Sequence, residues 1–408
     1  MIRRVSLAAL LGAALLWTGC ATPYMKAQQA YFKGDPATAE IVLAPVAQKE
    51  TEKNGKLKNL YLWDMGIYRF SQGDYDGAIE VFMQSVKDAE RIHDAGETMG
   101  AAVTSAASQQ YVGDPVEISM AYLYLGTSYF MKGDYQNALI GFRRSIEEDL
   151  SKDEARRGDM GITNFLLGEC YSRTGNFDDA VVAYRRAIQH EENLVPAYAS
   201  LYWALKKQGN GSDVARIQEE IEKRAGKGYL ESIDGTAGQG IIVAMFAGQA
   251  SRVKGDMFLG AFRQRDEFGF KVASWEASIN PADPHLALFP TDNMHEHFKD
   301  QGGMGDEAKK QATRLVASKA MSAIPILGLF APSTKADLRF WPTLPGTVHV
   351  GYLPTQPGSY NISVKAYDKN QKPLSGYFQT WAGVIVPENR RALVVLTSWR
   401  SASYEKAR

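Results

Sequence analysis

Histidines form one small cluster in the chain, and their spacing suggests metal binding. His295 and His297 are separated by a single residue, with Asp292 and His285 close by in the sequence. If the pair stood on a strand, both rings would point the same way, as a metal site requires. The surrounding segment reads as a loop, however, and no distant third ligand is evident. A periplasmic metal-binding protein or hydrolase using His295 and His297 is therefore the alternative, and we assign no catalytic residue, metal or cofactor.

The two cysteines, Cys20 and Cys170, predict different chemistry. Residues 1–19 begin with basic side chains and continue with an apolar run that is too short to span a membrane. Thr18-Gly19-Cys20 then resembles the end of a bacterial lipoprotein signal, which implies that Cys20 is acylated; an ordinary secretory signal is the alternative. Cys170 is expected to be a small buried side chain. Once Cys20 carries lipid, no intramolecular disulfide can form.

Charge and motifs narrow the function further. The 46 basic and 46 acidic residues balance, so the chain lacks the excess of positive charge that is typical of nucleic-acid-binding proteins. The sequence contains no phosphate-binding Walker motif, no nucleophile elbow and no HExxH zinc motif. Gly238 and Gly240 precede a predicted strand, whereas a dinucleotide fingerprint follows one. We therefore expect a protein that is not an enzyme.

The elements that must position any site are helical hairpins, and residues 120–148 show the pattern best. Apolar and small residues recur at the spacing of one helix face: Tyr122, Leu125, Gly126 and Tyr129. Gly133 interrupts the pattern, and Asp134 is a good N-cap for a second helix. Gly126 and Ala138 are small where two helices of a hairpin must approach closely. The sequence therefore predicts two antiparallel helices here.

The hairpin pattern recurs along the chain, with glycines at the predicted turns: Gly34, Gly73, Gly133, Gly175 and Gly209. This pattern is that of the tetratricopeptide (TPR) repeat. The spacing is irregular because the interval between the second and third glycines holds an insertion, residues 91–116. Its composition suits either a thin helix followed by a loop or a mobile flap. The predicted fold class is α+β, an irregular TPR α-solenoid followed by a smaller, mostly β C-terminal domain.

Glycines concentrated in residues 226–240 predict the boundary between the two parts. After it we expect a buried strand, one helix near residues 304–327, and further strands between Pro/Gly turns, at residues 241–246, 348–350, 360–367 and 392–397. The expected organisation is a lipoprotein signal peptide (1–19), a helical repeat domain (20–225) and a C-terminal mixed domain (226–408).

Several blocks of the sequence resemble a family of bacterial TPR outer-membrane lipoproteins: residues 111–117, 138–144, 240–254 and 337–345. This family is similar to lipoproteins found alongside activators of peptidoglycan synthases. The resemblance implies a role in cell-envelope assembly or its regulation, and it brings no catalytic residues. Ala21, directly after the lipidation cysteine, resembles the outer-membrane version of the sorting rule. Together these features imply an outer-membrane protein, anchored through lipid at Cys20 and facing the periplasm.

TPR arrays line a concave groove with the first-helix face that does not pack within the hairpin. On this sequence, the residues projected onto that face are Trp63, Leu123, Thr127, Phe130, Phe165, Glu169 and Arg173. Apolar side chains there would hold an extended or helical segment of an envelope protein or peptide. The alternative is that the insertion or the C-terminal domain covers them as ordinary core. The function we expect is that of a protein-binding scaffold or adaptor in cell-envelope assembly.

Overall fold

The computed structural model describes residues 22–96, 110–149, 158, 160–250, 252–255, 263–266, 272–280, 285–300, 339–375, 379–398 and 402–404. The signal segment, Cys20, the centre of the insertion and the helix predicted near 304–327 lie outside these residues. Helix α5 extends into the predicted insertion as far as Gly96, and α6 begins at Pro115.

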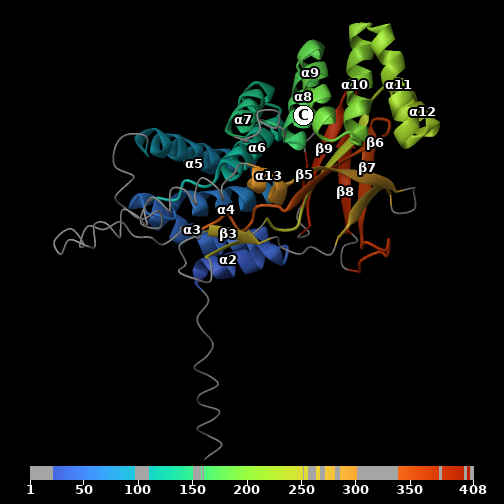
Figure 1. Cartoon of the computed structure of the whole chain (residues 1–408). Helices are drawn as coiled ribbons and strands as arrows, with labels where there is room; N and C mark the ends of the chain where they lie inside the picture. Colours follow the sequence, from blue (N-terminus) through green and yellow to red (C-terminus); the bar gives the residue numbers. More distant parts are fainter. Residues whose placement is uncertain are drawn as a thin grey trace, which may run out of the picture.

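Among the described residues, five helical hairpins follow one another from Pro23 onward, and a single helix ends the series. The hairpins are α2 (Pro23–Phe32) with α3 (Pro36–Glu52), α4 (Lys58–Ser71) with α5 (Tyr75–Gly96), α6 (Pro115–Met131) with α7 (Tyr135–Glu148), α8 (Gly161–Arg173) with α9 (Phe177–His190), and α10 (Val195–Gln208) with α11 (Gly211–Ala225); α12 is Lys227–Gly235. Figure 1 shows these helices following one another around one side of the strands. The helical part thus continues past residue 225, because the glycine-rich stretch contains one more helix.

The turns of the hairpins are built as the sequence predicts. All five turn glycines have positive φ, between 73° and 84°, a conformation that costs a residue with a Cβ but not glycine. The next residue caps the second helix with its side chain. In the third hairpin, for example, the Asp134 carboxylate accepts a hydrogen bond from the Asn137 backbone N–H at 3.2 Å. These local rules stop each first helix and start each second one.

A glycine on the first helix makes room for an aromatic ring from the second in three successive hairpins. A Cβ placed on Gly66, Gly126 or Gly168 would lie 2.5–2.8 Å from the ring of Phe82, Phe142 or Tyr184, respectively. Such distances are well inside van der Waals contact, so these positions exclude larger residues. The close approach predicted at Gly126 is therefore confirmed, and Ala138 on the second helix is fully buried. Cys170 is buried as expected.

The C-terminal part forms an eight-stranded sheet in the order β10-β9-β1-β6-β5-β4-β7-β8. Its strands are β1 (Gly240–Ala247), β4 (Ser274–Ile279), β5 (Leu286–Asn293), β6 (Thr347–Pro354), β7 (Gly358–Tyr367), β8 (Gln379–Val386), β9 (Arg391–Thr397) and β10 (Ala402–Tyr404). Strand β1 pairs with β9 in parallel, and the remaining pairs are antiparallel. Strands β2 (Arg252–Gly255) and β3 (Arg263–Asp266) form a separate hairpin, and α13 (Met294–Asp300) follows β5. The four strands predicted from sequence are thus confirmed.

Both faces of the central strands are buried, which explains the continuous apolar run of β1. Ile242, Ala244 and Phe246 join the apolar core formed by the helices. Ile241, Val243 and Met245 point into a second core, shared with β4, β6, β7, β8 and β9. Strands β8 and β9, far apart in the strand order, also contact each other. The sheet is therefore curled around its own core while its other face packs on the helices.

No helix among the described residues is long and apolar enough to cross a membrane.

Candidate functional site

In three successive hairpins, the first helix carries one buried carboxylate that contacts residues of the C-terminal part. Asp64 on α4 accepts a hydrogen bond from the Thr343 hydroxyl at 2.5 Å. Glu117 on α6 accepts one from the Trp341 backbone N–H at 2.8 Å. Glu169 on α8 forms an ion pair with Arg391 at 2.6 Å. Because buried polar groups need partners, these three contacts fix where the C-terminal part sits against the array.

A fourth carboxylate belongs to the C-terminal part and contacts the array. Asp292 lies at the end of β5, and its two oxygens accept hydrogen bonds from the backbone N–H groups of Gly161 and Ile162, at 2.9 and 2.8 Å. These are the first residues of α8, where unpaired N–H groups and the helix dipole favour a negative charge. Asp292 thus closes the start of a helix that has no capping side chain of its own.

The histidine cluster is not assembled into a metal site. His297 contacts Asp292 at 3.0 Å through Nε2, while that carboxylate is already engaged with α8. The segment predicted as loop is instead strand β5 followed by helix α13, so His295 and His297 stand on a helix and do not share a face. His285 lies 3.4 Å from the Ser278 hydroxyl. The described residues contain no group of three His, Cys, Asp or Glu side chains that could hold a metal ion.

Five of the seven residues predicted to line a groove are no more than 1% exposed: Trp63, Leu123, Thr127, Phe130 and Phe165. The ring of Trp63 lies 5.0 Å from that of Trp341, in the C-terminal part. The Thr127 hydroxyl donates to the carbonyl of Leu123 on its own helix.

The rings of Phe130 and Phe165 contact the second helix of their own hairpin, at Phe142 and Tyr184, respectively. The assignment of these two rings to a face that does not pack within the hairpin is therefore wrong, since the ring of each fills its hairpin. Partner binding by the five buried residues stays a prediction, and it would require the covering segments to move away.

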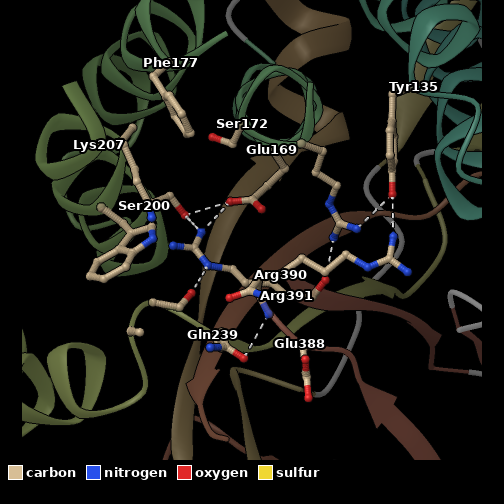
Figure 2. A pocket seen from close by; sticks show the side chains of 16 residues that line it. Tyr135, Glu169, Ser172, Phe177, Ser200, Lys207, Gln239, Glu388, Arg390 and Arg391 are labelled. Carbon is tan, nitrogen blue, oxygen red and sulfur yellow. Dashed lines mark hydrogen bonds and ion pairs between the residues drawn. The ribbon is translucent and has the colours of Figure 1, made fainter. Parts of the chain in front are cut away.

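The remaining two predicted residues, Glu169 and Arg173, line a cavity of about 380 Å³ at the edge of the helix–sheet contact. Its walls come from α8, α9 and α10, the start of α7, residues 237–239 and the turn between β8 and β9. Figure 2 shows Arg391 at the centre, with Phe177 and Lys207 on one side and Tyr135 on the other. The lining residues are Tyr135, Glu169, Ser172, Arg173, Phe177, Ser200, Trp203, Ala204, Lys207, Ala237, Gly238, Gln239, Glu388, Asn389, Arg390 and Arg391.

Arg391 is held in the floor of this cavity. Its guanidinium donates to Glu169 and to the Ser200 hydroxyl, and Nε donates to the Gly238 carbonyl at 2.9 Å. Although burial acts to lower the pKa of Arg391, the adjacent Glu169 carboxylate raises it above the ordinary value. The charges of the floor are thus paired with each other, and Arg391 joins the sheet to two helices, α8 and α10.

Two further guanidinium groups converge on one wall. Nη1 of Arg173 and Nη1 of Arg390 donate to the Tyr135 hydroxyl at 3.2 and 3.1 Å. Arg173 also donates to the backbone carbonyl of Arg391 at 2.7 Å, and its guanidinium lies 4.5 Å from the centroid of the Phe130 ring. Figure 2 labels Arg390 and Tyr135 on this wall. The lining combines arginine, lysine and glutamate side chains with the hydroxyls of Ser172 and Ser200.

Sequence reasoning reached Glu169 and Arg173 but missed Arg390 and Arg391. Those two arginines lie far along the chain, since 218 residues separate Arg391 from Arg173. An isolated Arg-Arg pair after a turn carries no signal of a site. Only the position of β9 beside β1 brings it to the array.

Stacked helical hairpins with these turns and small-residue contacts have the form of TPR repeats, and a curled sheet packs against them. A sequence model described as tetratricopeptide repeat matches residues 117–191, which are α6 to α9. No curated protein shows significant similarity to the chain.

Solved structures of MamA resemble part of the fold. One, titled as the crystal structure of MamA protein, has 20% identity and a TM-score of 0.38, covering 52% of this chain and 94% of its own. MamA 41-end from Desulfovibrio magneticus RS-1 has 16% identity and a TM-score of 0.36, covering 54% and 96%.

Proposed function

We propose that the protein is a lipid-anchored scaffold that binds another protein of the bacterial cell envelope and performs no chemical turnover. The observation that carries this proposal is the array of five TPR-like hairpins with a charged cavity left open at its edge. Repeat arrays of this kind present extended surfaces to protein partners. The one hydroxyl of the lining that donates to a lining carboxylate is that of Ser200, and its partner Glu169 is already held by Arg391. We take this arrangement as favouring binding over catalysis.

The same proposal includes the address of the protein. An apolar leader that ends in Cys20 supports acylation there, and Ala21 supports retention at the outer membrane, facing the periplasm. A Cys20→Ser protein should therefore leave the outer-membrane fraction, because one signal for lipid attachment is lost. Cys170→Ser is the matched control, since this thiol is buried on α8, and it should fractionate unchanged. If Cys20→Ser stays in the outer-membrane fraction, anchoring through this cysteine is excluded.

Crosslinking in native envelopes tests the scaffold role itself. A photo-crosslinking residue at Asn389, which is exposed at the cavity mouth, should give one dominant adduct with a second envelope protein. The same residue at Lys49, on α3 and outside the cavity lining, should not. Equal adduct patterns from the two positions, or none from either, would argue against a partner at this site.

A further inference from the structure

Besides the ion pair in the floor, the side chains that line the cavity include more cations than carboxylates. Arg173, Lys207 and Arg390 line it together with one carboxylate, Glu388. Arg391 is excluded from this balance because Glu169 neutralises it. Low-dielectric walls focus such a field, which raises the local concentration of anions and excludes cations.

Aromatic rings provide a further part of the lining. Trp203 is half-buried, and the Nζ atoms of Lys206 and Lys207 lie 5.2 and 5.5 Å from its ring centroid. Phe177 also lines the cavity and lies on the same side as Lys207 in Figure 2. A flat apolar surface next to a cation suits a ligand that combines an apolar group with a negative charge.

We propose that this cavity binds a peptide segment of the partner in which an acidic side chain stands next to an aromatic one. The carboxylate would meet Lys207 and the guanidinium of Arg390, and the aromatic ring would lie against Trp203. This inference rests on the proposed function and names the chemistry by which the scaffold recognises its partner. The cavity volume, about 380 Å³, lies in the range of pockets that enclose a small group rather than a whole domain.

The form of the cavity favours a segment of a chain over a free anion. Its mouth is made by exposed residues, Lys207, Glu388 and Asn389, so a side chain can enter while its backbone stays outside. Ser172 and Gln239 add neutral polar groups along the wall, of the kind that can orient a peptide.

The test uses the full chain with Cys20→Ser, labelled with ¹⁵N, and follows the indole N–H signal of Trp203, identified by its absence in Trp203→Phe. The probe is the capped peptide Gly-Glu-Phe-Glu-Gly, and its neutral match is Gly-Gln-Phe-Gln-Gly. We expect the acidic peptide to shift the Trp203 signal in a saturable way. The neutral peptide should bind at least tenfold more weakly, and added salt should lower the affinity for the acidic peptide.

Charge-reversed variants locate the binding. Lys207→Glu and Arg390→Glu should each lower the affinity for the acidic peptide at least tenfold. Lys223→Glu is the matched control, because Lys223 is exposed on α11 and does not line the cavity, and it should leave the affinity unchanged. Far-UV circular dichroism checks that each variant is folded. If Arg390→Glu unfolds the protein, Lys207→Glu decides alone, since its side chain is exposed.

Three results would overturn the inference: no shift with the acidic peptide, equal affinity for both peptides, or affinity unchanged in Lys207→Glu. A shift with inorganic phosphate but not with the acidic peptide would also overturn it, and would make the cavity a site for a free anion. The scaffold role is tested separately by the crosslink at Asn389. If that adduct forms while the peptide fails to bind, this inference fails and the proposed function stands.

Discussion

At the scale of single residues, the molecule depends on carboxylates buried between the array and the sheet. Glu169 accepts hydrogen bonds from the Tyr184 hydroxyl at 2.8 Å, from the Ser200 hydroxyl at 2.9 Å and from Arg391. Both members of the ion pair are nearly inaccessible, with side-chain exposures of 8% for Arg391 and 3% for Glu169. A buried pair adds little net stability, but removing one member leaves a buried charge uncompensated. Glu169→Gln should therefore lower the free energy of unfolding by about 3 kcal/mol, measured by urea denaturation.

The control for this change is Glu388→Gln, at the exposed mouth of the same cavity. It should alter the unfolding free energy by no more than about 0.5 kcal/mol. Equal stability of the two variants would show that the Glu169–Arg391 pair is not formed in solution.

Asp64 gives the protein a pH dependence of its own. Burial raises the pKa of this carboxyl to about 7, even though the hydrogen bond from the Thr343 hydroxyl acts to lower it. In the unfolded chain the pKa is about 3.9. At a pH between these two pKa values, the unfolded chain releases the Asp64 proton while the folded protein keeps it. The stability that this proton contributes is therefore complete below about pH 4 and is lost as pH rises to 7. From pH 5 to 8 the loss amounts to about 2–3 kcal/mol.

Asp64→Asn isolates this contribution, because the amide keeps the shape and has no proton to release. The difference in unfolding free energy between Asp64→Asn and the unchanged protein should shift in favour of the variant from pH 5 to pH 8. His349 contributes with the opposite sign, since burial lowers the pKa of its imidazole to about 4, but this contribution is common to both proteins and cancels. A difference that stays constant with pH would show that Asp64 titrates normally.

At the scale of helices and strands, close contact between α6 and α7 sets the shape of the third hairpin. A Cβ on Gly141 would lie 2.6 Å from the Cα of Gly126 and 2.8 Å from its backbone nitrogen. Since both atoms belong to the backbone of α6, no side chain can rotate away, and the helices themselves must separate. Gly141→Ala should destabilise the protein by about 1–3 kcal/mol, the usual cost of overpacking.

Gly228→Ala on α12 is the matched control for this substitution, because no atom lies within 4 Å of the added Cβ. Alanine favours a helix over glycine by up to about 1 kcal/mol, so this variant should be as stable as the unchanged protein or slightly more so. Thermal melts of both variants, followed by circular dichroism, give the comparison. If Gly141→Ala melts at the same temperature as Gly228→Ala, helices α6 and α7 do not approach as closely as described.

The hairpins could be predicted from sequence because their signals are local. Gly133 and Asp134 stop one helix and start the next through groups within a few residues. The segment around His295 behaved differently, since its proline and polar residues indicate a loop. It becomes β5 and α13 because β5 gains partners on both sides, β4 and β6, and such distant pairing leaves no mark in the segment itself. Asp64 and Glu117 were missed for a related reason: a carboxylate inside a helix looks like a solvated one until Thr343 and Trp341 are placed against it.

At the scale of the whole molecule, the array and the sheet share one continuous apolar core. Phe246 on β1 lies 5.3 Å from the ring of Tyr124 on α6, and Trp341 lies 5.0 Å from Trp63 on α4. Removing the C-terminal part would expose this apolar face of the array to water, at about 25 cal/mol for each Å². The prediction of separate domains, 20–225 and 226–408, concerns how the chain is divided. The shared core concerns stability: the sheet has an inner core of its own, but its other face and the apolar face of the helices are buried only by each other.

Cooperative unfolding should follow from this shared core. In a full chain with Cys20→Ser, helix content measured by circular dichroism and the fluorescence of Trp275, which lies in the sheet, should change at the same urea concentration; comparison with Trp275→Phe isolates that signal. Phe246→Ala removes a ring at the contact and should shift both transitions together, by about 3–5 kcal/mol. Ile385→Ala, on β8 and 44% exposed, should shift neither appreciably. If helices and sheet unfolded separately, or if Phe246→Ala moved only the sheet signal, the array would stand without its C-terminal cover, and its first-helix face would then be free to take a partner.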